Sequence, residues 1–439
     1  MSRSESLSKL LRARQSELRL PGVSAAATVR GEVVWQEAFG MVDTNSGGEP
    51  THDTQYRVGS ITKTFTAASV LALRDEGRLG LDDSLGDYIP EAEDSPLTLR
   101  RMLAHSSGLQ REVPGAVWIT FEFPETSEEL VARFREAEQV LEPGSHWHYS
   151  NLAFALLGEV VTRVSGKTID QFVEERFLEP LGLARTSWLR QPPAATGYYV
   201  DPWADVLHAE IEVERSGSAA AAGDLWSTPT DLCHWADFLT GRDAMHTVQV
   251  MAEPERWTLG WGLGLMLHRR GERVFFGHSG AMPGFISSLA CDRKERVGVA
   301  VAANASTPAM GVETLALELA EAALEAYPAE TEPWRPGAAP PPELEGVLGH
   351  WWSEGTEYVF RYAQGRLEAV AAGLARIKEP AHFEAEAPDR YRTTAGRERG
   401  ELLLVLRDDG GSVSELRWAT YALTREPRTF ASYRSPENP

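Results

Sequence analysis

Ser60 and Lys63 lie three residues apart in the stretch YRVGSITKTF, at the start of an apolar segment. The chain has only five lysines, so a serine–lysine pair at this spacing is less expected by chance than in an average sequence. Unpaired backbone N–H groups in the first turn of a helix favour a developing negative charge on such a serine. A lysine one turn later lies on the same face and can relay a proton. The pair predicts a nucleophilic serine with an amine partner.

The same spacing also has a structural explanation, a helix-capping serine followed by a solvated lysine. Ser6 and Lys9 illustrate this explanation, because they lie in the polar segment SRSESLSKLLRARQSEL, whose pattern is typical of an amphipathic surface helix. We expect no chemistry from Ser6.

Two further groups follow along the chain. Tyr149 and Asn151 stand two apart in HWHYSN, and His278 and Gly280 stand two apart in FFGHSGAMPGF. With Ser60 and its lysine, in this order, they resemble the serine β-lactamase and DD-peptidase superfamily, in particular its class C β-lactamase-like branch. Two neighbouring segments agree with the resemblance, LTLRRMLAHSSGL and AAAGDLWSTPTDLCHWADFL. The similarity extends over roughly residues 10–326.

The resemblance implies a role for each matched residue. Ser60 is the acylated nucleophile and Lys63 its electrostatic and proton-relay partner. Tyr149 is the general base that later protonates the leaving group, and Asn151 orients the substrate amide. The backbone N–H groups of Ser60 and Ala281 form the oxyanion hole.

The third motif departs from the β-lactamases, which usually carry lysine where this chain has His278. Histidine resembles the D,D-carboxypeptidase, D-aminopeptidase and esterase members. With Gly280 beside it in the substrate site, His278 would hold a substrate carboxylate when protonated or as a hydrogen-bond donor. We therefore predict a serine hydrolase acting through an acyl-enzyme on small peptides or amides, including those with D-residues, or on esters. The alternatives are a true β-lactamase and a non-hydrolytic penicillin-binding-type sensor.

The elements around these residues predict an α/β (α+β) fold. Residues 22–40 form a hairpin pattern, and residues 284–304 give two strands around a charged turn. Helical spacing begins at Ser60 and returns in residues 310–327. Between the strand regions, residues 96–255 are mostly helical. We expect an antiparallel sheet flanked by helices, with an all-α lobe.

Three regions divide the chain. Residues 1–331 are predicted to be the hydrolase domain, and residues 332–343 a stiff proline-rich linker. The short strand patterns of residues 344–439 predict a small β-barrel-like domain with no catalytic residues. Its tryptophan pair, Trp351 and Trp352, is expected in its core or against the catalytic domain.

Composition restricts the partners. The chain has 439 residues and a formal net charge of −21, which disfavours nucleic acid and anionic membranes. No apolar run reaches the length of a membrane span, and no signal peptide is recognised, so we expect a cytoplasmic protein. The expected partner is a small molecule or a short peptide substrate, and the sequence leaves the oligomeric state open.

Other motifs predict no metal or cofactor. His146 and His148 lack a third ligand at a metal-site interval. His105 is expected to satisfy turn backbone and is left out of the site. Cys233 and Cys291, the only cysteines, are expected to be core thiols. No Gly-x-Ser-x-Gly stretch supports an α/β-hydrolase nucleophile.

Overall fold

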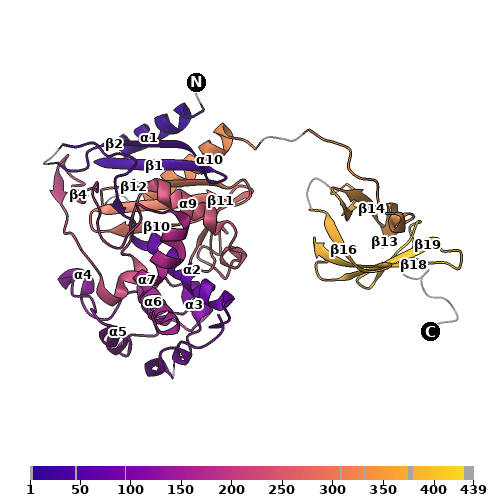
Figure 1. Cartoon of the computed structure of the whole chain (residues 1–439), viewed down its shortest axis with the longest axis horizontal. Coiled ribbons are helices and arrows are strands. Elements are labelled where there is room, and N and C mark those ends of the chain that lie inside the picture. Colours follow the sequence, from indigo (N-terminus) through magenta and orange to yellow (C-terminus); the bar gives the residue numbers. More distant parts are fainter. Residues whose placement is uncertain are drawn as a thin grey trace. The chain divides into compact units, whose positions relative to one another are not determined.

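The computed structural model describes residues 3–44, 47–93, 95–306, 309–329, 333–373 and 379–429, without the side chains of residues 309 and 310. The chain divides into two compact units, Met1–Ala329 and Glu330–Pro439 (Figure 1). The predicted start of the linker, residue 332, lies outside the described residues, and residues 333–341 form neither helix nor strand. Among the described residues, no helix is long and apolar enough to cross a membrane.

The first unit is organised around an antiparallel sheet of eight strands, as predicted in type. Strands from the first and last parts of the unit are neighbours in this sheet, where Val23 pairs with Ala303. The order across the sheet is β2 (Glu32–Gly40), β1 (Gly22–Val29), β12 (Val297–Ala303), β11 (Phe285–Asp292), β10 (Arg273–Met282), β9 (Met266–Arg270), β8 (Leu259–Trp261) and β7 (Val250–Met251).

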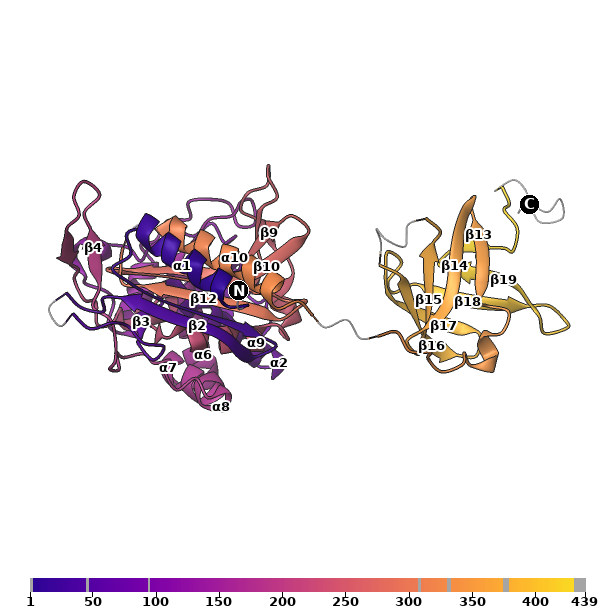
Figure 2. The same cartoon turned by 90° about the horizontal axis from the view of Figure 1, so that it is seen from above.

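Helices cover both faces of this sheet (Figures 1 and 2). Helices α1 (Glu5–Glu17) and α10 (Ala309–Ala326) pack on one face, where Ala25 and Ala27 join their apolar cluster. Helix α9 (Pro229–Leu239) packs against β1, β11 and β12, and Ala26 joins its cluster. Successive residues of a strand point to opposite faces, so β1 is buried along nearly its whole length.

The helical lobe forms the second layer of the first unit. Helix α2 (Thr62–Asp75) packs against α6 (Asn151–Ser165), whose N-terminus is capped by the Ser150 hydroxyl accepting from the Ala153 N–H at 3.0 Å. The remaining helices are α3 (Leu99–Leu103), α4 (Val117–Thr120), α5 (Ser127–Phe134), α7 (Ile169–Val173) and α8 (Glu179–Leu181), with a π-helical turn at Glu174–Leu178. Helix α9 lies in the helical stretch of the sequence but packs on the sheet, because its apolar face meets the strands.

Short elements complete the first unit. Strand β3 (Tyr56–Arg57) pairs with β6 (Trp226–Ser227), and β4 (Tyr198–Val200) pairs with β5 (Leu207–Ala209). Short 3₁₀ helices lie at Gly59–Ile61, Leu85–Asp87, Pro90–Ala92, Gly217–Ala222 and Asp243–His246. The Gly59–Ile61 turn leads directly into α2.

The second unit is a nearly closed antiparallel barrel of eight strands, which confirms the barrel-like prediction. Trp352 and Thr424 exchange backbone hydrogen bonds of 2.8 and 3.0 Å, which joins the first strand to the end of the last. Trp351 is fully buried in the barrel core, and its indole N–H donates to the Val347 carbonyl at 2.7 Å. After a 3₁₀ turn at Pro342–Leu344, the strands are β13 (Gly349–Ser353), β14 (Thr356–Ala363), β15 (Arg366–Ala371), β16 (Ala381–Ala387), β17 (Arg390–Ala395), β18 (Leu402–Arg407), β19 (Val413–Trp418) and β20 (Tyr421–Leu423).

Candidate active site

Ser60 and Lys63 are positioned by the junction of the 3₁₀ turn with α2. Gly59 has a φ of +52°, a conformation that glycine adopts readily. Lys63 follows Ser60 by one turn, and its Nζ donates to Ser60 Oγ at 3.0 Å and to the Ala222 carbonyl at 2.5 Å. The helix therefore presents the hydroxyl and the amine side by side.

The Lys63 side chain is fully buried, which is unusual for a lysine. Burial lowers its pKa to about 7, with the charge of Glu112 opposing that shift and the charge of Arg111 adding to it. Among the described residues, no carboxylate forms an ion pair with Lys63. The amine can therefore be neutral near neutral pH.

Tyr149 lies next to this pair, just before α6. Burial raises the pKa of its phenol well above the usual range, and a hydrogen bond with the Ser60 side chain opposes the shift. Lys63 Nζ is 5.1 Å from the centroid of the Tyr149 ring, and the Arg111 guanidinium is 5.0 Å from it. The raised pKa favours the protonated phenol at neutral pH.

His105 packs against the Tyr149 ring. The two rings stack with centroids 4.1 Å apart, and His105 Nδ1 accepts from the Ser150 N–H at 3.0 Å. Burial holds the pKa of His105 well below its usual value. It is a neutral structural residue, as expected from the sequence, but its contact with the candidate site was not foreseen.

Asn151, the first residue of α6, is held by a charged pair that the sequence analysis missed. Its side-chain N–H donates to a Glu112 carboxylate oxygen at 2.7 Å, while its amide oxygen is buried without a hydrogen-bond partner among the described residues. Arg111 and Glu112 form an ion pair at 3.4 Å. Both residues lie just beyond the HSSGL stretch, after Gln110, and no spacing in the sequence indicates where they fold.

Strand β10 supplies the opposite wall of the site. A Cβ on Gly280 would lie 1.9 Å from the Val58 carbonyl oxygen and 2.9 Å from the Ser60 nitrogen, so only glycine allows this approach. Likewise, a Cβ on Gly59 would lie 2.6 Å from the Ala281 nitrogen. The close approach brings the backbone of Ser60 next to that of Ala281, as an oxyanion hole requires.

His278 also lies on β10, but its state differs from the charged form considered above. It is only 3 % exposed, and burial, followed by the nearby charge of Lys63, lowers its pKa to about 3. Its Nδ1 lies 2.5 Å from the Ser279 carbonyl oxygen, which can only accept, so Nδ1 carries the proton. An imidazolium that pairs with a substrate carboxylate is therefore not supported, because the buried ring is neutral and its single N–H is already used.

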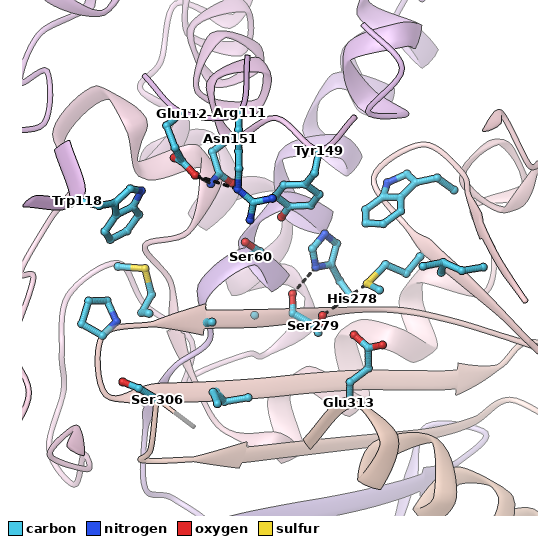
Figure 3. Close-up of a pocket in the computed structure, with 18 of the residues that line it drawn as sticks. Ser60, Arg111, Glu112, Trp118, Tyr149, Asn151, His278, Ser279, Ser306 and Glu313 are labelled. Carbon is cyan, nitrogen blue, oxygen red and sulfur yellow. Dashed lines mark hydrogen bonds and ion pairs between the residues drawn. The ribbon is translucent and has the colours of Figure 1, made fainter. Parts of the chain in front are cut away.

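Ser60, Tyr149, Asn151 and His278 line one cleft of about 720 Å³ (Figure 3). A second hollow of about 50 Å³ adjoins Ser60 and is mainly apolar, lined by Val113, Val117, Trp118, Phe123 and Met282 among others. All the residues predicted for the site thus lie in or against one cleft, including Gly280, Ala281 and the buried Lys63.

The alternative motifs remain outside this cleft. Lys9 pairs with Glu5 at 3.0 Å on α1, and Ser6 is exposed. In the described part of the chain, no group of three or more His, Cys, Asp or Glu residues is arranged to hold a metal ion. Cys233 and Cys291 are buried free thiols.

Comparisons with known proteins agree with this geometry. Beta-lactamase-like protein 2 of Dictyostelium discoideum is 32% identical over 229 residues, which cover 49% of this chain and 41% of that protein. The chain thus spans less than half of that relative. D-aminopeptidase of Brucella anthropi is 26% identical over 411 residues, covering 90% of this chain and 74% of the relative.

Solved structures show the same fold. A D-stereospecific amidohydrolase from Streptomyces sp. has a TM-score of 0.60 and 29% identity, covering 70% of this chain and 96% of that one. A class C β-lactamase has a TM-score of 0.63 at 20% identity, covering 75% and 97% of the two chains. It confirms the predicted fold class.

Family models account for both units. Residues 340–425 match a domain of unknown function, DUF7586. Residues 7–324, which contain the whole cleft, match the model described as Beta-lactamase. The chain therefore belongs to the Beta-lactamase family.

Proposed function

We propose that this protein is a serine hydrolase that works through a covalent acyl-enzyme on small peptides and amides, including those with D-residues, or on esters. The observation that carries the proposal is the contact between Lys63 and Ser60, in which a buried amine with a pKa of about 7 lies 3.0 Å from a serine hydroxyl. A neutral amine at this distance can accept the hydroxyl proton.

Acylation begins when Ser60 Oγ attacks the substrate carbonyl carbon and its proton passes to Lys63 Nζ. This assigns the base role to Lys63 instead of Tyr149, because the raised pKa of the phenol makes tyrosinate scarce at neutral pH. The negative charge that develops on the carbonyl oxygen is held by the N–H groups of Ser60 and Ala281. Each such donor typically contributes ~3–4 kcal/mol to transition-state stabilisation.

Collapse of the intermediate breaks the bond to the leaving group. The leaving nitrogen or oxygen takes a proton from Tyr149, and Lys63 returns the proton to the phenol oxygen. In the second half, water attacks the acyl-ester carbon, its proton passes to the same tyrosine–lysine unit, and Ser60 Oγ regains a proton as the acid product leaves. Asn151 directs the substrate amide through its unpartnered side-chain oxygen.

The substrate class is supported by the related proteins and by the small apolar hollow beside Ser60. Two matched proteins are named a D-aminopeptidase and a D-stereospecific amidohydrolase. The small apolar hollow beside Ser60 suits a short hydrophobic side chain on the acyl part. The neutral His278 lacks the cation that β-lactamases usually carry at this position, which argues against efficient β-lactam hydrolysis.

A panel of substrates tests the proposal. We expect the purified chain to hydrolyse p-nitrophenyl esters and aminoacyl p-nitroanilides of one configuration, with the acyl group found on Ser60 by mass spectrometry of quenched samples. Rapid turnover of a chromogenic cephalosporin would favour a β-lactamase instead, and stoichiometric acylation without turnover would favour a sensor. Absence of any covalent adduct and of any hydrolysis would refute the proposal.

A further inference from the structure

The cleft has two chemically different ends. Trp118 and Ser306 lie at one end, and Glu313 of α10 lies at the other, with its carboxylate directed toward the strand that carries His278 and Ser279 (Figure 3). Met266 of β9, which accepts a hydrogen bond from the Ser279 hydroxyl at its sulfur, also lines the cleft.

The leaving group belongs at the Glu313 end if the proposed function holds. Tyr149, the proposed donor to the leaving group, has its ring centroid 6.3 Å from that of His278. Ala281, which holds the carbonyl oxygen in the proposal, lies three residues further along β10, on the side of the apolar hollow. A substrate bound along β10 therefore places its acyl part at the hollow and its leaving group toward Glu313.

Glu313 is not neutralised by a strong base. Its nearest cationic candidate is His268, whose Nε2 lies 3.8 Å from the carboxylate, and burial lowers the pKa of that histidine. Arg270, on the same strand, is engaged with Glu321 at 2.8 Å. Among the described residues, no lysine or arginine pairs with Glu313.

The rest of this end offers no free cation to a carboxylate. The single N–H of neutral His278 is used by the Ser279 carbonyl. Among the described residues that line the cleft, Arg111 is the only arginine or lysine, and it is paired with Glu112 at 3.4 Å. A carboxylate placed here would meet a like charge, and such placement is costly in a partly desolvated cleft.

We propose that Glu313 determines specificity for the leaving group, binding an ammonium or amide N–H group there and disfavouring a carboxylate. The substrates are then peptides or amides whose leaving part ends in an amide or carries a cation, not peptides with a free carboxylate next to the cleaved bond. This inference rests on the proposed function and names the substrate class of the same site.

Ratios of kcat/KM between matched substrates test the inference. Two pairs of substrates suffice, and each substrate is prepared in the L and in the D configuration. The first pair is alanyl-lysine amide and alanyl-norleucine amide. The second pair is alanyl-alanine amide and alanyl-alanine. We expect the native protein to favour the lysine amide over the norleucine amide, and the amide over the acid, by about tenfold or more each. Equal kcat/KM values within each pair, or a higher kcat/KM for the acid than for its amide, would overturn the inference.

Two variants separate charge recognition from a structural effect. Glu313→Gln is expected to reduce both ratios to within about threefold of unity, since the amide keeps the shape but not the charge. Glu325→Gln makes the same charge change at an exposed position of α10 and is expected to keep both ratios. Unchanged ratios in Glu313→Gln would refute the role of Glu313.

Ionic strength gives a measurement that does not depend on a folded variant. In the native protein, both ratios are expected to fall between about 0.05 M and 0.5 M salt, because screening weakens charge recognition in an open cleft. Salt-independent ratios would contradict the inference. The proposed function fails separately: it fails if no ester or anilide of the panel is hydrolysed and no covalent adduct forms, whereas Ser60-dependent hydrolysis without charge preference refutes only the role of Glu313.

Discussion

Lys63 Nζ lies 3.0 Å from Ser60 Oγ, and the lysine side chain is fully buried. The same amine also donates to the Ala222 carbonyl, so its position is fixed by two contacts. A lysine in water at neutral pH is almost always protonated, and burial brings this one into the range where it can act as a base.

Ser60→Ala is expected to abolish hydrolysis and covalent labelling by a serine-directed phosphonate. Far-UV circular dichroism should be unchanged, because Ser60 is not the N-cap of its turn or of α2, and even a lost cap costs only ~1 kcal/mol. The matched control is Ser6→Ala, at the exposed serine of α1 with the same serine–lysine spacing. Labelling that persists in Ser60→Ala, detected by intact mass, would exclude Ser60 as the nucleophile.

Lys63→Ala and Tyr149→Phe are each expected to lower the acylation rate by at least about a hundredfold, the usual scale of proton-transfer groups. The double variant should lose much less than the product of the two effects, because residues that act as one unit are not additive. Single-turnover kinetics with one ester measures all three. Multiplicative losses would assign the two residues to independent roles.

The pKa of Lys63 sets the pH dependence of acylation. Its neutral form is required, so kcat/KM should rise with pH and level off above about 7. A profile measured on an uncharged ester excludes titration of the substrate. A plateau reached already at about pH 5 would show that another group is the base, since ordinary carboxylates titrate below that value.

The same shift should appear in stability. The Lys63 pKa is about 7 in the folded chain against the ordinary value of 10.5, so between these values the unfolded state binds the extra proton. The free energy of unfolding therefore rises with pH across this window, by up to roughly 5 kcal/mol from this group. Lys63→Met should remove that rise, as measured by urea unfolding at several pH values.

His278 should contribute no ionisation to catalysis between about pH 5 and 8, because burial holds its pKa at about 3. The ionisation of His278 instead affects stability in acid. Between pH 6.5 and about 3 the unfolded state binds a proton that the folded state does not, so the free energy of unfolding falls as the pH is lowered. His278→Asn should weaken this loss, whereas His208→Asn, at an exposed position, should not. Equal acid sensitivity of His278→Asn and the native chain in urea unfolding would contradict the neutral buried state.

Gly280→Ala is expected to reduce kcat by at least about a hundredfold, because the new Cβ would meet the Val58 carbonyl and displace the Ser60 N–H. Gly241→Ala serves as the control, since its nearest neighbour would be 3.9 Å from the added atom. Burst kinetics with an activated ester distinguishes slow acylation from loss of binding. Native-like acylation by Gly280→Ala would show that β10 can shift without harm.

Local patterns in the sequence were sufficient to predict the helices and strands that carry the candidate residues. The spacing of Ser60 and Lys63 equals one helical turn, so their neighbourhood follows from the helix alone. The β1–β2 hairpin and the β11–β12 pair follow from segments adjacent in the chain, whereas the pairing of β1 with β12 joins distant segments and is seen only in the tertiary structure. The sequence analysis placed α9 in the helical lobe, but α9 packs on the sheet. The sequence of an amphipathic helix shows its apolar face but not the element against which that face packs.

Only the tertiary structure decided the charge states in the cleft. A pKa depends on desolvation, and the segments that bury Lys63 and His278 are distant in sequence. The sequence could not show that burial disfavours both a protonated His278 and a deprotonated Tyr149. The sequence likewise did not predict that Glu112 and Glu313 line the cleft. The cleft forms where elements distant in the sequence meet, and the sequence around each glutamate does not show this.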